Sequence, residues 1–418
     1  MDNAPQTVES RRITFAHDDE LLLMLPEDDV VDPEVSIVIP ALNEEKVISQ
    51  FMDWCHEGIR KAGVVAEILI IDSSTDHTRE IALAKGARLL KTPLRGLGQA
   101  YRDAIPVIRG KYVICGDADC TYDFREIAPF IAKFREGYEF VMGSRFTGSI
   151  EPGAMPPLHR YFGTPLTNFI LNFIYGTKFT DIHCGMRGVT LDALKRMNLR
   201  SRSWEYASEM IVKSVRLKLK TAQAPVKFYK DIKGRVSHHK RMGWFSPWRA
   251  GWINLRTMLV HGADFFVMKP GAVLFTLGLL ISLALAAGPM TLAGVTFSLN
   301  TMMLGSTLSI AGLQFIFLGC MAQSLYDPSG GAVKHWLKVF AYSRTMLGSF
   351  AVFLAGLALT SIFLLSYMEA DFLVAPGLLR SNHLAVVGLL AIVLSFQTFI
   401  STLLLHAIAA YMAKNDNA

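Results

Sequence analysis

Charged residues are scarce in this chain of 418 residues. Lys, Arg, Asp and Glu together make up 19% of the sequence, whereas hydrophobic residues make up 51%. A soluble domain usually carries about 25% charged residues. The composition excludes a disordered protein and a protein that coats nucleic acid, so no nucleic-acid partner is expected, and a purely soluble enzyme is a poor fit. The length predicts two or three structural units, at about 150 residues each.

Cysteines are also few, and they lack the spacing of a metal site or a disulfide framework. An odd number of cysteines in a long chain indicates a reducing compartment. The first 34 residues lack the basic start and long apolar core of a secretory signal, because they are acidic and hold only one apolar run, Leu21–Leu25. We therefore expect the first domain to remain in the cytosol. The five cysteines are Cys55, Cys115, Cys120, Cys184 and Cys320.

Long apolar runs are confined to the C-terminal part of the chain. Each is close to the roughly 20 residues that a helix needs to cross a bilayer, and Gly and Ser recur inside them, as close helix packing in lipid favours. Buried helices of a soluble bundle are the alternative, but four runs with almost no charge are hard to hide in a soluble core. The predicted spans are residues 272–287, 301–322, 345–367 and 384–411.

Basic residues are distributed unevenly around these spans. The loop between the second and third spans carries Lys334, Lys338 and Arg344, whereas the loop between the first and second has no charge. The loop between the third and fourth has only Arg380 as a base, and residues 227–269 before the first span are strongly basic. Because cytoplasmic loops carry the excess of Lys and Arg, we expect both termini and the large domain on the cytoplasmic side of the cell membrane.

Residues 35 to about 230 alternate short apolar strands with helical stretches. Apolar strands joined by helices imply a parallel sheet that is covered on both faces. Ligands of such sheets bind at the carboxyl ends of the strands, so the polar residues after Ile39, Ile71 and Cys115 are candidates for a site. Strands are predicted at 35–39, 67–71 and 111–115, and helices at 44–61, 75–85 and 124–136.

The segment Asp117-Ala118-Asp119 follows the last of these strands. At a turn both carboxylates can converge on one ligand, with one on a sugar hydroxyl and the other on a divalent ion. Hard oxygen ligands suit Mg²⁺ or Mn²⁺, especially when diphosphate oxygens complete the coordination shell. A plain Asp-rich turn is the alternative, but the position after the third apolar strand favours the metal. Asp72 follows the second strand and precedes Ser and Thr, which predicts both helix capping by residues 73–75 and a carboxylate that accepts a hydrogen bond from a base.

The ordered motifs of the first 200 residues resemble a known family. IVIPALNEE, IIDSSTDHT, GLGQA, GDADCTYD, GSRF and CGMRG are similar to the GT-A glycosyltransferases of family 2, and more narrowly to polyprenyl-phosphate glycosyltransferases such as dolichol-phosphate mannose and glucose synthases. The resemblance covers residues 35 to about 269. It implies a Rossmann-like, mostly parallel α/β domain, a nucleotide-sugar donor, a metal at the Asp-x-Asp turn, inversion at the sugar carbon and a lipid-phosphate acceptor.

The resemblance also implies roles for individual residues. The nucleotide-sugar pocket is expected to comprise Pro40, Leu42, Glu44, Asp72, Asp117, Ala118 and Asp119. Asp117 is expected near the ribose or sugar, and Asp119 is expected to bind Mg²⁺ or Mn²⁺. Two positions depart from the family: Asp72 is followed by Ser73 rather than a second Asp, and Leu97 stands between two glycines where Lys is usual. The base, uracil or guanine, and the diphosphate contacts stay open for that reason.

The acceptor side is predicted from a basic stretch, residues 230–240. Cations, a hydroxyl and a glycine N–H are the groups that a phosphate needs. The stretch resembles the family's phosphate-binding loop, with His238 where Lys is common. Attachment to anionic lipid is the alternative. Arg145, Arg187 and Glu209 match family positions too, as binding residues or as structural ion pairs. The predicted acceptor contacts are Arg145, Lys233, Arg235, Ser237 and His238.

Two segments are amphipathic and rich in aromatic residues, near 157–175 and at 244–266. Aromatic residues with interspersed Arg are typical of a helix that lies in a membrane interface, although ordinary core helices fit as well. We therefore divide the chain into an acidic segment 1–34, a GT-A domain 35–240 with an interface helix near 157–175, a juxtamembrane helix 241–269 and a four-helix transmembrane domain 270–418.

These predictions combine into a membrane-bound glycosyltransferase that moves a hexose from a donor resembling UDP-glucose or GDP-mannose to polyprenyl phosphate. A membrane enzyme with a hydroxyl acceptor is one alternative, but its Gln/Arg-x-x-Arg-Trp motif is absent from the sequence. A non-catalytic anchor or flipping subunit is another, against which the four acidic residues Glu44, Asp72, Asp117 and Asp119 argue. Membrane lipids are expected partners, and a homo-oligomer is compatible with the sequence.

Overall fold

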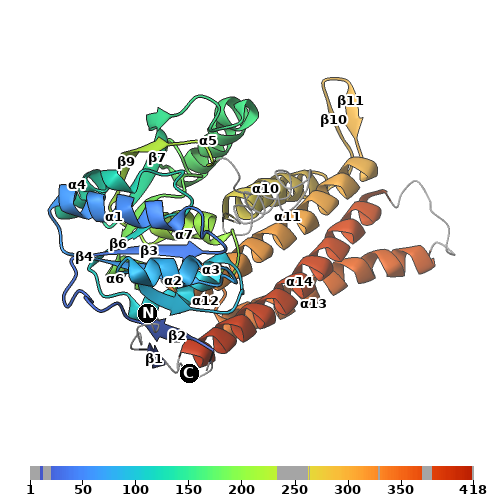
Figure 1. Ribbon diagram of the computed structural model, residues 1–418. Helices are drawn as coiled ribbons and strands as arrows, with labels where there is room; N and C mark the ends of the chain where they lie inside the picture. The colour runs from blue at the N-terminus through green and yellow to red at the C-terminus, as the bar shows by residue number, and fades with distance from the viewer. Residues whose placement is uncertain are drawn as a thin grey trace, which may run out of the picture. The chain divides into compact units, whose positions relative to one another are not determined.

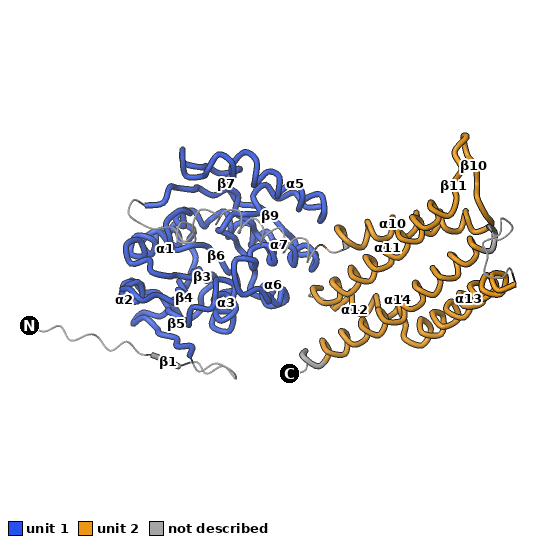
Figure 2. The backbone as a smooth tube through the Cα atoms, turned by 90° about the vertical axis from the view of Figure 1, so that its right-hand side faces the viewer, with its two compact units in different colours: residues 1–258 blue, residues 259–418 orange. Residues whose placement is uncertain are grey.

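The computed structural model describes residues 10–12, 20–232, 262, 264–327, 330–369 and 379–416. The chain forms two compact units, Met1–Met258 and Leu259–Ala418, which Figure 2 shows in blue and orange. The first unit contains the α/β domain, and the second contains the apolar helices. The predicted juxtamembrane helix, residues 241–269, lies almost entirely outside the described residues, so its boundaries stay a prediction.

A nine-stranded sheet forms the centre of the first unit, with the strand order β1-β2-β5-β4-β3-β6-β8-β7-β9. The four central strands β5, β4, β3 and β6 are parallel to one another, whereas β2 and β8 pair with them in antiparallel fashion. The sheet is therefore mixed but mostly parallel at its centre. Its strands are β1 (Ser10–Arg12), β2 (Leu22–Met24), β3 (Val35–Ala41), β4 (Ala66–Asp72), β5 (Arg88–Lys91), β6 (Tyr112–Cys115), β7 (Phe140–Ile150), β8 (Arg187–Thr190) and β9 (Thr221–Phe228).

Helices pack around this sheet, and Figure 1 shows their arrangement. Helix α1 packs beside α2 and α4, while α3 and α6 each pack beside α7. They are α1 (Ile48–Ala62), α2 (Thr78–Ala84), α3 (Leu97–Ala104), α4 (Ala128–Arg135), α5 (Thr164–Tyr175), α6 (Leu191–Met197) and α7 (Tyr206–Arg216).

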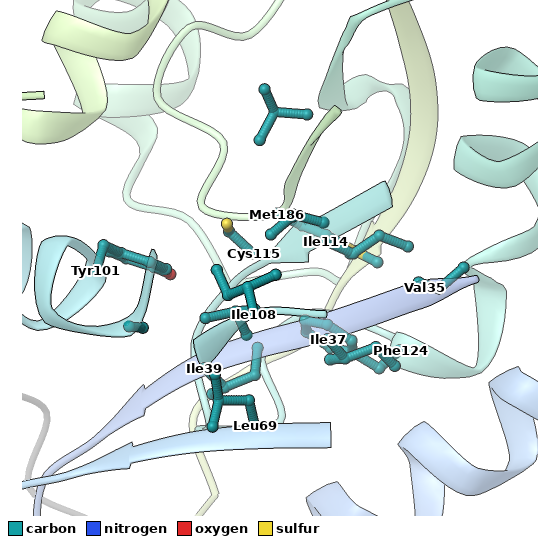
Figure 3. Packing of buried hydrophobic residues seen from close by; sticks show 14 of the residues in the cluster. Val35, Ile37, Ile39, Leu69, Tyr101, Ile108, Ile114, Cys115, Phe124 and Met186 are labelled. Atoms are coloured by element: carbon teal, nitrogen blue, oxygen red, sulfur yellow. The ribbon is translucent and has the colours of Figure 1, made fainter. Parts of the chain in front are cut away.

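The hydrophobic core lies between the central strands and these helices. In Figure 3 the side chains of Ile37 and Ile39 from β3 lie on the same face of the sheet as that of Ile114 from β6, and all three are fully buried. β4 is buried along its whole length, and β3 is buried at every position except one. Strands buried on both faces explain why the sequence shows continuous apolar runs instead of alternation.

The first unit departs from the sequence predictions in its details. β5 was not predicted, so the strand that ends at Cys115 is the fourth of the parallel set and not the third. Helix α2 begins at Thr78, so capping by residues 73–75 is wrong: the side chain of Asp76 accepts the Thr78 N–H instead, at 3.0 Å. The helix predicted at 124–136 is a 3₁₀ turn, Phe124–Glu126, followed by α4, in which Pro129 occupies the first turn.

The second unit contains the predicted apolar helices. Within the described residues, four helices are long and apolar enough to cross a membrane, at Phe265–Ala284, Leu299–Tyr326, Tyr342–Glu369 and Asn382–Ala413. Each overlaps one predicted span, and the first begins at residue 265 and not at 272. The elements of the unit are a π-helical turn (Asp264–Met268), α10 (Lys269–Ala284), β10 (Met290–Leu292), β11 (Val295–Phe297), α11 (Leu299–Tyr326), α12 (Gly331–Val339), α13 (Tyr342–Glu369) and α14 (Leu379–Asp416).

Glycines allow these helices to pack closely in pairs. Helices α10 and α11 lie side by side, and the β10–β11 hairpin joins them (Figure 1). A Cβ added to Gly278 of α10 would lie 2.4 Å from the backbone oxygen of Gly305 in α11. A Cβ added to Gly356 of α13 would likewise lie 2.7 Å from the backbone oxygen of Gly388 in α14. Such close backbone approach is typical of helices that associate in lipid.

Candidate functional site

The strand register brings the predicted site residues to one edge of the sheet. Asp72, the last residue of β4, pairs with Ala41 of β3, and Cys115 of β6 pairs with Val38. Because the central strands are parallel, the residues that follow them, including Asp117 and Asp119, continue beyond the same edge. The candidate site is therefore the carboxyl edge of β4, β3 and β6, as expected for a parallel sheet.

The loops after β3 and β4 hold each other through side chains. The backbone N–H of Asn43 donates to Ser74 Oγ at 2.8 Å, and Asn43 Oδ1 accepts the N–H of Thr75 at 2.9 Å. Glu44 is 5% exposed, and its N–H donates to Thr78 Oγ1 at 2.8 Å. Sequence reasoning included Glu44 in the site but missed Asn43, whose positive φ of 58° allows this turn. The pocket wall that Pro40, Leu42 and Glu44 are predicted to form is thus a preorganised loop.

Asp72 is completely buried and already has a cationic partner. Arg79 donates to Asp72 Oδ2 from Nε at 3.0 Å and from Nη2 at 2.9 Å. Asp72 Oδ1 accepts the N–H of Ser74 at 3.2 Å. The forked ion pair holds the carboxylate in one orientation and neutralises it, which a buried charge requires. Arg79 has no counterpart among the residues predicted from sequence.

The Asp117-Ala118-Asp119 segment forms a tight turn after β6. Cys120 has a positive φ of 58°, which bends the chain directly after Asp119. Asp119 Oδ1 accepts hydrogen bonds from the Thr121 N–H at 3.0 Å and from Thr121 Oγ1 at 2.6 Å. On the other side, a Cβ added to Gly185 would lie only 2.5 Å from Asp117 Oδ2. The Gly185 segment, which is far away in sequence, therefore packs against the Asp117 carboxylate.

Three buried tyrosines lie near Asp117. Burial, with a contribution from the nearby Asp117 carboxylate, raises the pKa of Tyr101, Tyr122 and Tyr206 above the ordinary value for a phenol. Tyr101 O–H donates to the backbone oxygen of Gly116 at 3.2 Å and its ring stacks on Tyr206 at 4.7 Å. Tyr122 Oη accepts the Gly185 N–H at 2.8 Å. All three stay protonated at neutral pH, so none of them can act as a general base there.

The acidic turn is suited to a divalent ion whose ligands come partly from the protein and partly from a substrate. No group of three or more His, Cys, Asp and Glu side chains suited to a metal occurs in the described part of the chain. Mg²⁺, however, is often bound through one or two carboxylates together with substrate phosphates and water. Thr121 orients Asp119 through Oδ1, and carboxylate oxygen is the ligand type that Mg²⁺ and Mn²⁺ prefer. The residues present thus fit a metal that binds together with a diphosphate.

Of the three charged residues that match family positions, Arg145 and Glu209 form buried ion pairs. Arg145 is 8% exposed and forms a forked ion pair with Asp181, with Nε 2.6 Å from Oδ2 and Nη2 2.8 Å from Oδ1. Glu209 is 1% exposed, pairs with Lys213 at 2.6 Å and accepts backbone N–H groups from the loop before α7. An acceptor contact by Arg145 stays a prediction, since the ion pair occupies most of its fork.

Arg187 is the third such residue, and it lies almost entirely in the interior at 1% exposure. Its Nη1 donates to the backbone oxygen of Ala207 at 2.9 Å and its Nη2 to that of Cys184 at 2.6 Å. Among the described residues, its Nε has no hydrogen-bond partner. The predicted acceptor loop with Lys233, Arg235, Ser237 and His238 lies outside the described residues.

His183 adjoins the segment that packs on Asp117. Burial and the nearby Arg145 guanidinium lower the pKa of His183 to about 4. Its Nε2 lies 2.9 Å from Thr167 Oγ1 of α5. The imidazole is therefore neutral over the physiological pH range, and its contact with α5 is a neutral hydrogen bond.

Comparison with known proteins identifies the family. Residues 36–197 match the family described as glycosyl transferase family 2, and residues 320–409 match the glycosyltransferase family 2 C-terminal transmembrane region. The low-salt glycan biosynthesis hexosyltransferase Agl6 of Haloferax volcanii is 33% identical over 398 residues, which cover 93% of this chain and 92% of that protein. The chain belongs to glycosyltransferase family 2. It is a glycosyltransferase with a mostly parallel, GT-A-like domain and a helical C-terminal region that holds four candidate transmembrane helices.

Other relatives of this glycosyltransferase match its first half. The dolichyl-phosphate hexose transferase of H. volcanii is 26% identical over 202 residues, or 47% of this chain and 82% of that protein. The dolichyl-phosphate β-glucosyltransferase ALG5A of Trichomonas vaginalis is 27% identical over 227 residues, or 49% of this chain and 69% of that protein. Among solved structures, glucosyl-3-phosphoglycerate synthase of Mycobacterium tuberculosis, in complex with Mn²⁺, UDP and phosphoglyceric acid, has a TM-score of 0.42 and 22% identity over 55% of this chain and 78% of that chain.

Proposed function

We propose that this glycosyltransferase transfers a hexose from a nucleotide diphosphate sugar to polyprenyl phosphate at the cytoplasmic face of the cell membrane. The observation that carries the proposal is the Asp117-Ala118-Asp119 turn at the carboxyl edge of the parallel central strands, in a chain whose described residues include four apolar helices long enough to cross a membrane. The names of the two dolichyl-phosphate transferases among its relatives support the same acceptor class.

The donor is proposed to bind across the loops after β3, β4 and β6. Pro40, Leu42 and Glu44 would line the nucleoside on one side, and Asp72, held by Arg79, would accept a hydrogen bond from the base. Asp117 and Ala118 would lie beside the ribose or sugar. This assignment uses the buried, prearranged loops that the structure shows at this edge, so the enzyme loses little conformational entropy when the donor binds.

Asp119 is proposed to hold Mg²⁺ or Mn²⁺ together with the donor diphosphate. When bound, the ion would stabilise the negative charge that develops on the departing diphosphate. Thr121 keeps the Asp119 carboxylate oriented through two hydrogen bonds to Oδ1. Orienting such a ligand before the reaction is the protein's main contribution to this kind of catalysis.

A phosphate acceptor needs no strong base, because it is already anionic near neutral pH. The described residues around Asp117 agree with this requirement, since Tyr101, Tyr122 and Tyr206 are all held in the neutral form. A hydroxyl acceptor, by contrast, needs a group that removes its proton. Catalysis would then depend on the positioning of donor and acceptor and on the stabilisation of the leaving group. The loop with Lys233, Arg235, Ser237 and His238 is proposed to orient the acceptor phosphate.

Helix α5 and the π-helical turn before it (His159–Gly163) are proposed to lie in the membrane interface. This segment is exposed along an apolar face: Tyr161 is 73%, Phe162 62%, Phe169 66% and Phe173 67% exposed. Large apolar patches on a protein surface usually mark an interaction site. An interface position would bring the catalytic edge close to a lipid acceptor, because Thr167 of α5 contacts His183 beside the Asp117 segment.

The proposal is tested by following sugar transfer in membranes that contain the full chain. Radiolabelled UDP-glucose or GDP-mannose is supplied with polyprenyl phosphate, and the label is separated into aqueous and organic phases. We expect an organic-soluble, acid-labile product in the wild type and none in Asp119→Ala. Asp192→Ala is the matched control, because this carboxylate is exposed on α6 and pairs with Arg196 on the same helix. Label in a polymer, or in a lipid glycoside that resists mild acid, would contradict the acceptor assignment.

A further inference from the structure

The loop that precedes α7, residues 199–205, is locked against the start of α3. The N–H of Gln99 donates to the backbone oxygen of Arg202 at 3.0 Å. A Cβ added to Gly96 would lie 2.4 Å from that same oxygen, and one added to Gly98 would lie 2.4 Å from the backbone oxygen of Ser201. The two glycines therefore leave space for this loop, and only glycine lets the two backbones come so close.

A buried carboxylate holds the loop from its other side. Glu209 of α7 accepts the N–H of Arg200 at 2.9 Å and the N–H of Ser201 at 2.9 Å, and it pairs with Lys213 at 2.6 Å. Burial by itself would raise the pKa of Glu209. The ion pair with Lys213 and the hydrogen bonds from the backbone N–H groups outweigh that effect and hold the pKa below its usual range, so Glu209 stays ionised. The loop is thus anchored by hydrogen bonds to a charged acceptor, which are among the stronger ones in proteins.

This anchored loop lies next to the catalytic edge. Tyr206, the first residue of α7, stacks on Tyr101 of α3, and the Tyr101 hydroxyl bonds to Gly116, directly before Asp117. Figure 3 shows Tyr101 on its helix beside the strand that carries Cys115. One short chain of contacts therefore connects the loop to the Asp117-Ala118-Asp119 turn.

The loop presents two arginines without a structural role of their own. Arg200 and Arg202 are both exposed, and within the described residues neither side chain has a hydrogen-bond or ion-pair partner. Other arginines near the site are committed: Arg79 pairs with Asp72, and Arg145 pairs with Asp181. A guanidinium on a rigid backbone is suited to phosphate, because its planar fork donates two parallel hydrogen bonds.

We propose that Arg200 and Arg202 form an anion-binding edge that holds a phosphate group of a substrate beside the acidic turn. The group is either the diphosphate of the donor or the phosphate of the lipid acceptor, and this inference rests on the proposed function. Both substrates are anions that must approach three carboxylates, Asp72, Asp117 and Asp119, of which the first is already neutralised. Exposed arginines beside the acidic turn would lower the electrostatic free energy that an anionic substrate needs to approach these carboxylates.

The test uses the full chain in neutral detergent, with Arg200→Gln, Arg202→Gln and Arg202→Lys. Binding of UDP and GDP with Mn²⁺ is measured by calorimetry without turnover, and transfer is measured against each substrate with defined polyprenyl phosphate. Loss of a charge-assisted phosphate contact typically costs roughly ten- to a hundredfold in affinity. We expect at least one Gln variant to lose that much, with kcat changed less than KM, and Arg202→Lys to recover part of it.

The two arms of the test, diphosphate binding by calorimetry and transfer kinetics, distinguish whether the bound phosphate group belongs to the donor or to the acceptor. Weaker binding of the nucleoside diphosphate that the wild type uses assigns the edge to the donor. A higher KM for polyprenyl phosphate with unchanged diphosphate binding assigns it to the acceptor. Arg196→Gln, an exposed arginine of α6 that pairs with Asp192 and Glu139, is the control and should match the wild type in both arms.

Unchanged constants in both arms for both Gln variants would overturn the proposal, as would a change that appears only in the melting temperature. Failure of the proposed function gives a different result. If the wild type transfers sugar to a hydroxyl acceptor, polyprenyl phosphate has no KM to measure, and the calorimetric arm alone decides. Weaker diphosphate binding by a Gln variant then supports the anion-binding edge, and unchanged binding overturns it.

Discussion

Replacing Gly185 with alanine should damage catalysis through Asp117, although Gly185 itself has no side chain to bind a substrate. The new Cβ would lie 2.5 Å from Asp117 Oδ2 and 2.9 Å from the ring of Tyr122, whereas ordinary contacts begin at 3.4 Å. Tyr122 is buried and bonded to the Gly185 N–H, so it has little room to move. The Asp117 carboxylate should therefore shift by about 1 Å.

The size of the effect follows from that displacement. A misplacement of about 1 Å in a reacting or positioning group can reduce the rate roughly a hundredfold, or about 2.7 kcal/mol in activation free energy. The substitution also overpacks the interior, which typically costs about 1–3 kcal/mol of folding stability. The assay is kcat/KM for sugar transfer per folded protein in detergent, together with the melting temperature of each variant.

Gly188→Ala is the matched control, because it overpacks the same segment without touching Asp117. Its Cβ would lie 2.6 Å from Cζ of Phe134 and 3.2 Å from Cδ1 of Phe130. We expect both variants to melt at a lower temperature, but only Gly185→Ala to lose catalytic efficiency. Equal kinetic losses in the two variants, or near-normal kinetics in Gly185→Ala, would refute the idea that this glycine positions the carboxylate.

Three further predictions concern the metal, the topology and the response to pH. Asp119→Ala should lose metal-dependent turnover while the protein still inserts and folds, because a strand-end carboxylate adds little to the core; near-normal transfer by this variant in the presence of a chelator would show that the metal assignment is wrong. A cysteine at Ser381 should be labelled by an impermeant reagent from outside the cell, and one at Ala332 should not, with the five native cysteines replaced as needed; the reverse pattern would contradict a cytoplasmic catalytic domain. His183 has a pKa of about 4 in the folded protein and 6.5 in the unfolded chain, so between these pH values the unfolded chain binds a proton at His183 that the folded protein does not. The free energy of unfolding should therefore fall as the pH drops from about 6.5 to 4. His183→Gln should flatten the melting temperature over that range, and an unchanged slope would contradict the burial of a neutral imidazole.

The parts of the fold that depend on local pattern could be predicted from the sequence. Val35–Ala41 and Ala66–Asp72 are apolar enough to be identified as buried strands, and their carboxyl ends led directly to Glu44 and Asp72. The four apolar spans were identified for the same reason, since the bilayer requires long uninterrupted runs. Such patterns show which residues are buried and in what kind of element.

Contacts between distant segments could not be predicted in this way. β5 has only four residues with a charged residue at each end, and Arg88 is buried there because it pairs with Glu67 at 2.7 Å. The contact of Gly185 with Asp117 and the packing of Arg202 against Gly96 join segments that are far apart in the chain. No local periodicity records such pairs, so the anchored arginine loop emerged only from the folded structure.

The central claim is that a hexose alone, without phosphate, passes from the donor to polyprenyl phosphate at the Asp119 turn. Mass spectrometry of the lipid product and of the released nucleotide tests this directly, with purified full chain in detergent, defined polyprenyl phosphate and Mg²⁺ or Mn²⁺. The account predicts polyprenyl phosphate hexose and an equal amount of nucleoside diphosphate in the wild type, and neither in Asp119→Ala. A nucleoside monophosphate with a lipid diphosphate product, or an unmodified lipid, would contradict it.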